Sequence, residues 1–298
     1  MQTQSTTWDP ERYLRFAQQR ARPFADLLAR IPAERPVRVV DLGCGPGNAT
    51  ALLAERWPEA DVLGLDSSAE MIAAAQAKQI AGRLRFERAD LRDWRAAPPV
   101  DVLITNATLQ WVPGHLDLLP TLLGHVAPGG WFAMGVPGNF GAPSHTLLGD
   151  LQRDSRWSDR FTGAHFRPSS HEPADYLRAL TAAGGEAEAW ETTYYYVLPG
   201  VNGVLDFVSS TALRPVLTEL GGPGTLFELD RRVPADEPTA AHKATAEFEE
   251  SSDTDAARDF VNAYADALRV AYPPELFDGR TVQVLPYRRV FAVARIPA

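Results

Sequence analysis

The chain has 298 residues, of which 45% are hydrophobic and 22% charged, and its formal net charge is −9. A chain of this length can bury a sizeable core, so we expect one large domain, or one domain with a lid. The acidic balance lacks the broad attraction to phosphate backbones and to anionic membranes, and therefore argues against nucleic-acid and membrane partners.

The one cysteine, Cys44, excludes an intrachain disulfide and a cysteine-rich zinc site. A reducing, cytoplasmic compartment is the simplest expectation for such a chain. Residues 1–10 are polar and predict no signal peptide. No apolar run approaches the roughly 18 residues that a membrane span needs.

The first two thirds of the predicted elements alternate regularly. Residues 10–31 have the apolar spacing of a helix, and short apolar runs then alternate with helical patterns. We expect strands at 37–42, 62–65, 84–86, 100–105 and 130–136, with helices near 47–57, 68–80 and 115–126. Such alternation predicts βαβ units that build a parallel sheet with helices on both faces.

The regular alternation of strand and helix patterns ends after Pro137. Residues 138–171 show no clear period, whereas 172–183, 202–220 and 259–271 have helical spacing. Strand patterns occupy 186–198 and 282–296, and Pro286 predicts a bulge or an edge in the second of them. Residues 221–258 hold nine acids and four bases. We interpret this segment as an acidic surface insertion.

The strongest motif is Val39-Val40-Asp41-Leu42-Gly43-Cys44-Gly45-Pro46-Gly47-Asn48, which joins a predicted strand to a predicted helix. Glycines let a ligand approach bare backbone, and the helix N-terminus offers free N–H groups. The Gly-x-Gly-x-Gly spacing differs from the Gly-x-Gly-x-x-Gly fingerprint of nicotinamide enzymes. Pro46 removes one N–H donor, and Asp41 suits a cation better than a diphosphate.

Polar residues follow the next three predicted strands at their carboxyl ends. They are Asp66, Asp90 and Asn106. Ligands of open α/β sheets bind at this edge, and an acid after the second strand suits ribose hydroxyls. Ser67 is the expected N-cap of the following helix. Together with the glycine loop, this pattern predicts a nucleoside ligand.

These motifs resemble those of the class I S-adenosylmethionine-dependent methyltransferases, over roughly residues 37–137. The resemblance implies an α/β fold: a doubly wound, mostly parallel, Rossmann-like seven-stranded sheet with an antiparallel last strand and a helical lid. It divides the chain into a capping helix (1–33), a cofactor-binding core (34–137), a lid and substrate region (138–280) interrupted by the strand at 186–198, and a final strand (281–298).

The same resemblance implies S-adenosyl-L-methionine as the cofactor and assigns the residues around it. The glycine loop would surround the methionine part, Asp66 would accept the ribose hydroxyls, and Asp90 would contact the adenine amine. The full cofactor set is Asp41, Gly43, Cys44, Gly45, Asp66, Ser67, Met71, Asp90, Leu91, Asn106 and Trp111.

A closer resemblance, to the trans-aconitate 2-methyltransferase family, covers most of the chain. It is carried by residues 8–10, 20–23, 106–111, 192–195, 213–215 and 291–295. This resemblance implies a methyl ester formed on a carboxylate of a small polycarboxylic acid, with trans-aconitate as the preferred acceptor. The insertion at 221–258 departs from the family pattern, so another small-molecule acceptor, such as a secondary metabolite, stays open.

The proposed chemistry needs no catalytic side chain and no metal. A carboxylic acid is already anionic at neutral pH, so the protein has only to orient it and exclude water. Arginine holds carboxylates bidentately. We therefore expect Arg20, Arg22 and Arg214 to bind the acceptor, with Tyr194 and Tyr195 as further candidates. Arg288 and Arg289 are weaker candidates, because surface arginines are the default in an arginine-rich chain.

Two other functions remain open on the sequence. A non-catalytic protein that binds the cofactor would keep the same loop. A nicotinamide-dependent oxidoreductase is disfavoured by the loop spacing and by Pro46.

Overall fold

The computed structural model describes residues 17–161, 169–209, 211–221 and 252–298. Residues 1–16 and most of the insertion at 221–258 lie outside this description. The described chain forms two compact units. The larger contains residues 17–140, 169–194 and 287–298, and the smaller contains 141–161, 195–221 and 252–286, apart from residue 210.

The larger unit contains β1 to β5 and the adjoining parts of β6 and β8, in a sheet whose strand order is β3-β2-β1-β4-β5-β8-β6. The strands β1 to β5 pair in parallel, and β8 pairs antiparallel to β5. This confirms the doubly wound sheet with an antiparallel last strand. The strands are β1 (Arg38–Leu42), β2 (Asp61–Asp66), β3 (Leu84–Arg88), β4 (Val100–Asn106), β5 (Val126–Pro137), β6 (Glu186–Pro199) and β8 (Arg280–Arg295).

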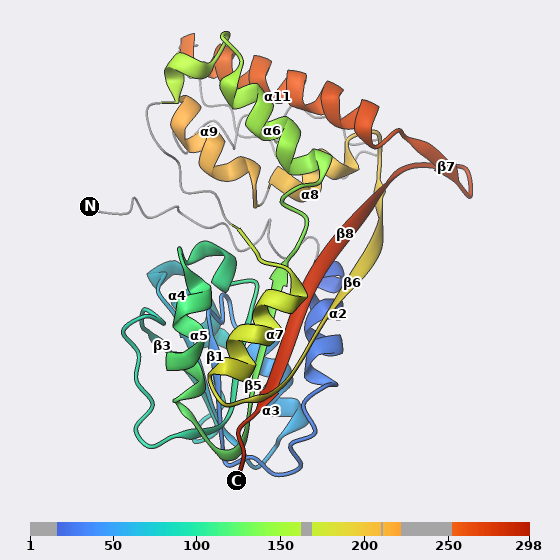
Figure 1. Ribbon diagram of the computed structural model, residues 1–298. Helices are drawn as coiled ribbons and strands as arrows, with labels where there is room; N and C mark the ends of the chain where they lie inside the picture. Colours follow the sequence, from blue (N-terminus) through green and yellow to red (C-terminus); the bar gives the residue numbers. More distant parts are fainter. Residues whose placement is uncertain (1–16, 162–168, 210, 222–251) are drawn as a thin grey trace. The chain divides into compact units, whose positions relative to one another are not determined.

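Helices connect these strands and cover the sheet. Right-handed crossovers place α3 and α4 on one face of the sheet and α5 on the other. Helix α7 packs against α5 (Figure 1). The helices of this unit are α2 (Ala17–Leu28), α3 (Asn48–Arg56), α4 (Ala69–Ala75), α5 (His115–Leu123) and α7 (Pro173–Ala182), with short 3₁₀ turns η1 (Gln76–Lys78) and η2 (Leu109–Trp111).

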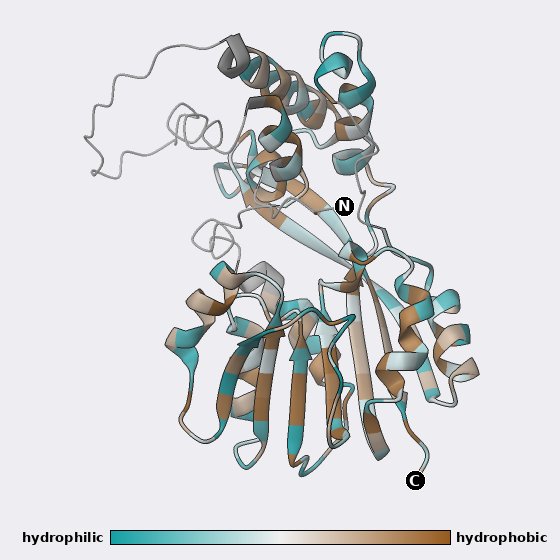
Figure 2. Cartoon of the chain, turned by 90° about the vertical axis from the view of Figure 1, so that its left-hand side faces the viewer, coloured by the Kyte–Doolittle hydropathy of each residue, from teal (hydrophilic) through white to brown (hydrophobic). Residues whose placement is uncertain are grey.

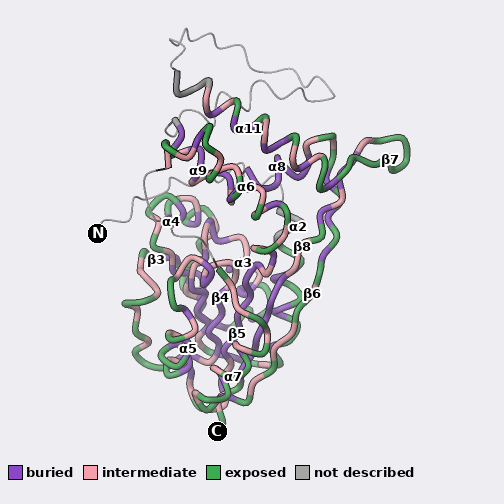
Figure 3. The backbone as a smooth tube through the Cα atoms, turned by 45° about the horizontal axis from the view of Figure 1, so that its top comes forward, coloured by how far each residue is buried: buried purple, intermediate pink, exposed green. Residues whose placement is uncertain are grey.

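The core of the larger unit lies along the central strands. Val39 and Leu42 of β1 and Val102, Leu103 and Ile104 of β4 are fully buried. A parallel strand between two helical layers is buried on both faces, which explains continuous apolar runs rather than alternation. The strands are accordingly hydrophobic along much of their length in Figure 2, and β4 and β5 are largely buried in Figure 3.

The smaller unit is mostly helical. Its helices are α6 (Pro143–Arg153), η3 (Ser158–Arg160), α8 (Gly203–Ser209), α9 (Leu213–Gly221) and α11 (Ser252–Ala271). Helix α11 packs against α6, α8 and α9. Phe260 and Tyr264 of α11 are fully buried. The Phe260 ring lies 5.3 Å from that of Trp157, and the Tyr264 hydroxyl donates to the carbonyl oxygen of Ser144.

Several helix boundaries differ from the sequence prediction. Residues 202–220 form two helices instead of one, and α11 begins at Ser252, inside the predicted insertion. Helix α6 lies in the segment where no period was found, although Pro143 stands at its first turn, a favoured position for proline. The N-cap of α4 is Ser68, not Ser67: the Ser68 Oγ accepts from the Met71 N–H at 3.2 Å.

A short strand, β7 (Glu275–Phe277), pairs with the start of β8 and was not predicted. The two residues between these strands, Asp278 and Gly279, have φ angles of 49° and 73°. Positive φ at both positions is typical of the two-residue turn that Asp-Gly favours in hairpins. Pro286 lies exposed within β8.

Helix α7 falls in the range predicted for the lid, yet it belongs to the larger unit. The lid role of the smaller unit stays a prediction. Among the described residues no helix is both long and apolar enough to cross a membrane.

Candidate functional site

The predicted polar residues gather at one edge of the sheet. Asp66 ends β2 and Asn106 ends β4, while the glycine loop leaves β1 after Leu42. Leu42 is in register with Leu65 of β2 and with Thr105 of β4. Because these strands are parallel neighbours, Asp66, Asn106 and the glycine loop leave the sheet side by side.

The three loop glycines share a backbone conformation but have different surroundings. Gly43, Gly45 and Gly47 have φ angles of 77°, 54° and 79°. A Cβ on Gly43 would lie 2.0 Å from the Thr108 Oγ1, and one on Gly47 would lie 2.7 Å from Phe86. A Cβ on Gly45 would meet nothing within 4 Å. Two of the glycines are therefore required by packing, whereas Gly45 faces open space.

Hydrogen bonds fix the path of the loop. The N–H groups of Gly43 and Cys44 donate to the carbonyl oxygen of Leu65 at 2.7 and 2.9 Å. Lys78, one of two lysines in the chain, donates from Nζ to the Pro46 carbonyl oxygen at 2.9 Å. The loop then leads into α3, whose N-cap, Gly47, supplies no side-chain cap. The first N–H groups of α3 therefore lack a capping side chain.

Gly45→Ala should impair cofactor binding in addition to the loss of stability that alanine causes at any left-handed glycine. The added methyl group occupies the open space beside the loop, where we expect the methionine part to lie. The matched control is Gly82→Ala, since Gly82 also has positive φ (75°) and nothing within 4 Å of an added Cβ. Both variants should lose about 1–2 kcal/mol of stability through the left-handed backbone.

Isothermal titration with S-adenosylhomocysteine separates the two variants. We expect at least about tenfold weaker binding for Gly45→Ala, equivalent to about 1.4 kcal/mol, and wild-type affinity for Gly82→Ala. Equal affinities in both variants would place the ligand away from Gly45.

Asp66 joins the glycine loop to the start of α4 through its two carboxylate oxygens. Its Oδ2 accepts from the Gly45 N–H and its Oδ1 accepts from the Ser68 N–H, both at 2.9 Å. Burial raises the pKa of this carboxyl above its ordinary value, against the opposing effect of these hydrogen bonds. Each oxygen keeps a further lone pair, so the group can also accept the two hydroxyls of a ribose.

Asp41 is only 2% exposed and accepts a hydrogen bond from the Thr50 hydroxyl at 2.7 Å. Burial raises the pKa of Asp41 to about 7; the Thr50 bond opposes the shift and the charge of Asp66 adds to it. Burial also raises the pKa of the Cys44 thiol, with Asp41 and Asp66 contributing. Cys44 is 5% exposed and packs within the loop, and its contact with the cofactor stays a prediction.

Asp41→Asn should flatten the pH dependence of stability of the ligand-free protein. The Asp41 carboxyl ionises near pH 4 in the unfolded chain but keeps its proton to about pH 7 when folded. Between these values the folded state binds more protons, so the free energy of unfolding falls as the pH rises. Asparagine keeps the Thr50 bond and has no such proton.

Urea unfolding at pH 5 and pH 8 measures the effect. Between pH 5 and pH 8, ionisation of Asp41 should lower the free energy of unfolding of the wild type by on the order of a few kcal/mol. The decrease in Asp41→Asn should be markedly smaller. The exposed Asp93→Asn variant should keep the wild-type slope. An unchanged slope in Asp41→Asn would mean that Asp41 is ionised in the folded protein.

Asp90 and Asn106 make contacts that the sequence did not predict. Asp90 is ion-paired with Arg92, and this pair lowers the pKa of the Asp90 carboxyl. The Asn106 Oδ1 accepts from the Arg289 guanidinium at 2.5 Å. The Asp90 contact to adenine stays a prediction.

The remaining cofactor candidates lie near this edge with different exposures. Met71 of α4 is buried, Leu91 and Trp111 are half-buried, and Ser67 is exposed. Ser67 contributes its carbonyl oxygen, which accepts from the Arg88 Nε at 3.0 Å. Their cofactor contacts stay predictions.

The tyrosine run alternates as predicted: Tyr194 and Tyr196 are buried at 7% exposure, and Tyr195 is 69% exposed. The Tyr194 hydroxyl donates to Asp26 Oδ2 of α2 at 2.6 Å. Tyr194 belongs to the larger unit and Tyr195 to the smaller.

The arginine candidates are spread over both units. Arg20 and Arg22 lie in α2 of the larger unit, and Arg22 is exposed. Arg214 lies in α9 of the smaller unit. The side chains of Arg20 and Arg214 lie outside the described residues, so acceptor binding by these arginines stays a prediction.

Sequence reasoning missed two threonines of this region, Thr50 and Thr108. Thr50 stands in the first turn after the loop, where its hydroxyl reaches Asp41. Thr108 packs against Gly43, and its hydroxyl donates to the Gly43 carbonyl oxygen at 3.3 Å. The segment Asn106–Trp111 was noted only as a family resemblance, although a hydroxyl two residues after a strand end is a usable signal.

Comparison with known proteins agrees with the fold. Residues 39–130 match a family described as a methyltransferase domain. A solved phosphoethanolamine N-methyltransferase 2 of Haemonchus contortus, bound to S-adenosylhomocysteine, is similar with a TM-score of 0.53 at 15% identity, over 93% of this chain and 53% of that chain. The YcgJ protein of Bacillus subtilis gives 0.54 at 11% identity, over 93% and 99%. These likenesses show the fold.

Sequence relatives are much closer. A trans-aconitate 2-methyltransferase of Streptomyces avermitilis is 48% identical over 97% of this chain and 96% of its own length. One of Streptomyces coelicolor is 46% identical over 100% of this chain and 89% of its own length, an alignment whose span includes residues 221–258. The chain belongs to the trans-aconitate 2-methyltransferase family.

Proposed function

We propose that this protein is an enzyme that transfers the methyl group of S-adenosyl-L-methionine to a carboxylate oxygen of trans-aconitate. The observation that carries the proposal is the 46–48% identity, over nearly the whole chain, with relatives named for that reaction. The glycine loop and the half-buried carboxylate of Asp66 at one sheet edge support it independently.

The residues present fit the cofactor. Gly45 leaves bare backbone beside open space, and Asp66 has carboxylate lone pairs for ribose hydroxyls. Asp41 supplies a buried acid where a positive charge is favoured. When bound, the cofactor's sulfonium provides the electrophilic methyl group.

The acceptor needs orientation rather than activation. Its carboxylate oxygen is already ionised at neutral pH, so it would take the methyl group from the bound sulfonium, which would leave as the neutral thioether, without any side chain accepting a proton. The protein therefore has to hold two partners in line and exclude water, which suits an anion-binding site without a general base.

We propose that Arg20, Arg22 and Arg214 bind the acceptor's carboxylates, with one of Tyr194 and Tyr195 as a further donor, because neighbouring residues of a strand face opposite sides. Tyr194 would have to give up the bond from its hydroxyl to Asp26 Oδ2. Guanidinium forks match carboxylates bidentately, and phenol hydroxyls donate to them. We place the reaction in the cytoplasm, because Cys44 is a buried free thiol.

The test is an acceptor panel with methyl-labelled cofactor. The panel contains trans-aconitate, cis-aconitate, citrate and aromatic acids, and the product is followed as a base-labile labelled ester. We expect trans-aconitate to have the highest kcat/KM. A higher value for another acid would replace the acceptor. Tight cofactor binding without turnover on any acid would indicate a non-catalytic binding protein.

A further inference from the structure

Arg289 is a buried arginine on β8, at the carboxyl edge of the sheet. It pairs with Pro137, the last residue of β5. The side chain is 5% exposed, although arginine is almost never fully buried without a partner. Arg289 therefore brings a positive charge into the interior of the larger unit, at the edge where the glycine loop and Asn106 lie.

A glycine creates the path that this side chain takes. Asn106 of β4 is in register with Gly135 of β5, and Gly135 is in register with Phe291 of β8. A Cβ on Gly135 would lie 2.8 Å from Asn106 Oδ1 and 3.0 Å from Phe291. Because Gly135 has no side chain, Arg289 can reach across β5 and donate to Asn106 Oδ1.

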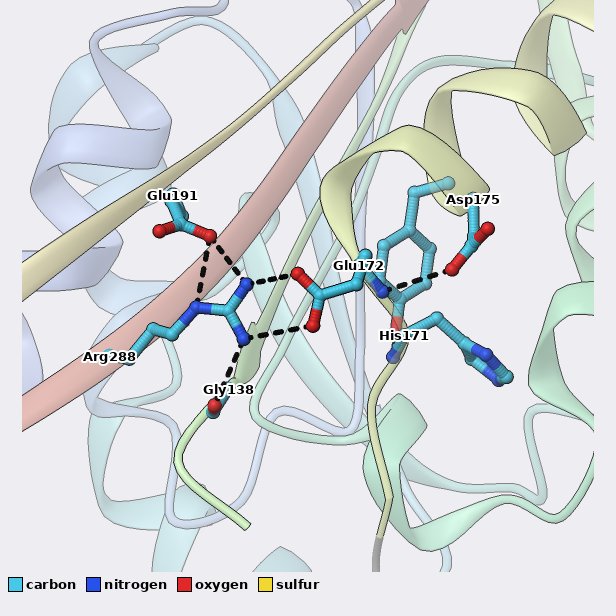
Figure 4. A network of polar contacts seen from close by, with 7 residues as sticks. Gly138, His171, Glu172, Asp175, Glu191 and Arg288 are labelled. Atoms are coloured by element: carbon cyan, nitrogen blue, oxygen red, sulfur yellow. Dashed lines mark hydrogen bonds and ion pairs between the residues drawn. The ribbon is translucent and has the colours of Figure 1, made fainter. Parts of the chain in front are cut away.

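The neighbouring Arg288, unlike Arg289, is paired with two carboxylates, those of Glu172 and Glu191 (Figure 4). Side chains alternate along a strand, so Arg288 and Arg289 face different sides of the sheet. Arg288 donates from Nε to Glu191 at 2.9 Å and from Nη1 to Glu172 at 3.2 Å and to the Gly138 carbonyl oxygen at 3.3 Å. These two carboxylates raise the pKa of Arg288, and they occupy its fork. Arg288 is a structural clamp between α7, β6 and β5.

Arg289 has no such counter-ion. Within the described part of the chain no carboxylate pairs with it, and its Nε is buried without a hydrogen-bond partner. Its other described contact is with the Phe291 ring, 6.0 Å away. Asn139, two residues beyond Pro137, is also buried, and its Oδ1 has no partner. A buried charge without an anion is costly, so an anionic ligand at this edge of the sheet would stabilise Arg289.

We propose that Arg289, positioned by Asn106, is a carboxylate-binding residue of the methyl-transfer site. This inference depends on the proposed function. Two molecules in that reaction carry a carboxylate, the methyl acceptor and the methionine part of the cofactor. Asn106 lies on β4, next to β1, the strand from which the glycine loop departs. This position beside the expected cofactor is compatible with a carboxylate from either molecule.

The test measures binding to four proteins: the wild type, Arg289→Gln, Arg289→Lys and Arg288→Gln. Calorimetry gives Kd values for S-adenosylhomocysteine, for 5′-methylthioadenosine, which lacks the carboxylate, and for trans-aconitate added to protein saturated with S-adenosylhomocysteine. Arg289→Gln should weaken at least one carboxylate ligand by about 10- to 100-fold, as expected for a charged hydrogen-bonding group.

The pattern identifies the source of the carboxylate. If Arg289→Gln binds S-adenosylhomocysteine more weakly and 5′-methylthioadenosine normally, Arg289 contacts the carboxylate of the cofactor. If Arg289→Gln binds trans-aconitate more weakly, Arg289 contacts the acceptor. Arg289→Lys should show a smaller loss than Arg289→Gln, because it keeps the charge and loses the fork. If Arg289→Gln does not fold, the Lys variant alone must show at least about a fivefold loss.

Arg288→Gln is the matched control, one residue away on the same strand. It should lower Tm and keep every Kd within about twofold. The proposal is overturned if both carboxylate ligands keep wild-type affinity in Arg289→Gln. It is also overturned if Arg288→Gln weakens the carboxylate ligands as much as Arg289→Gln does. The same holds if Arg289→Gln weakens 5′-methylthioadenosine as much as S-adenosylhomocysteine.

Failure of the proposed function would look different. Wild-type protein would then not bind trans-aconitate, while the S-adenosylhomocysteine arm would still report on Arg289. Citrate, malonate and benzoate replace trans-aconitate in that event. If the wild type binds none of them and S-adenosylhomocysteine is unaffected by Arg289→Gln, the carboxylate subsite is wrong.

Discussion

Asp66→Ala is expected to weaken S-adenosyl-L-methionine binding by about 100-fold or more, since it removes two charged hydrogen-bond acceptors of roughly 1.5–3 kcal/mol each. The carboxylate has a second role that adds to the loss. It accepts from the N–H groups of Gly45 and Ser68, so its removal also loosens the loop and the start of α4. Calorimetric titration with S-adenosylhomocysteine measures the loss.

The matched control for Asp66 is Asp61→Ala, at the other end of the same strand. Asp61 is partly exposed and forms a surface ion pair with Arg85. Such pairs contribute about 0–1 kcal/mol, so this variant should bind the cofactor normally. Wild-type affinity in a folded Asp66→Ala protein would remove the ribose role from Asp66 and the nucleoside interpretation with it.

Gly43→Ala should cause the largest loss of stability in the loop, roughly 3 kcal/mol or more. The new Cβ would lie 2.0 Å from Thr108 Oγ1 and 2.6 Å from the Thr108 Cβ. Threonine is branched and cannot turn both substituents away. The backbone itself, at φ 77°, adds about 1–2 kcal/mol for a residue other than glycine.

Gly129→Ala separates the two contributions in the Gly43 prediction. Gly129 has φ 78°, and a Cβ there would meet nothing within 4 Å. Urea unfolding of this variant should therefore show only the backbone cost. A second variant, Gly43→Ala with Thr108→Gly, should recover part of the loss. Equal destabilisation of the Gly43 and Gly129 single variants would mean that Thr108 moves aside freely.

The sheet could be predicted from sequence because its signals are local. The strands β1, β2 and β4 are short apolar runs, and β3 and β5 each contain one, so all five could be located, although β5 begins at Val126, before the predicted start at residue 130. The break between α8 and α9 was missed because both halves are apolar on one face, so the pattern alone does not mark the gap. Ser67 and Ser68 are both good caps, and the choice depends on the backbone angle after Asp66.

The candidate site likewise contains some residues that the sequence could identify and others that it could not. Gly43, Gly45 and Asp66 could be singled out because each follows directly on a short apolar run, at the end of the first or the second strand. The distinction between Arg288 and Arg289 could not, because it depends on register across three strands. Gly135 opens a path for one arginine, and Glu172 and Glu191 occupy the other. The sequence Arg288-Arg289 alone shows neither the space beside Gly135 nor the two glutamates.

The most direct test of the central claim is a crystal structure of the protein with S-adenosylhomocysteine and trans-aconitate bound. The account predicts the ribose hydroxyls on Asp66, the methionine part beside Gly45, and one acceptor carboxylate facing the cofactor sulfur. It also predicts a ligand carboxylate on the Arg289 guanidinium. A cofactor bound away from the carboxyl edge of β1 and β2, or trans-aconitate absent from the sulfur's vicinity at saturating concentration, would contradict it.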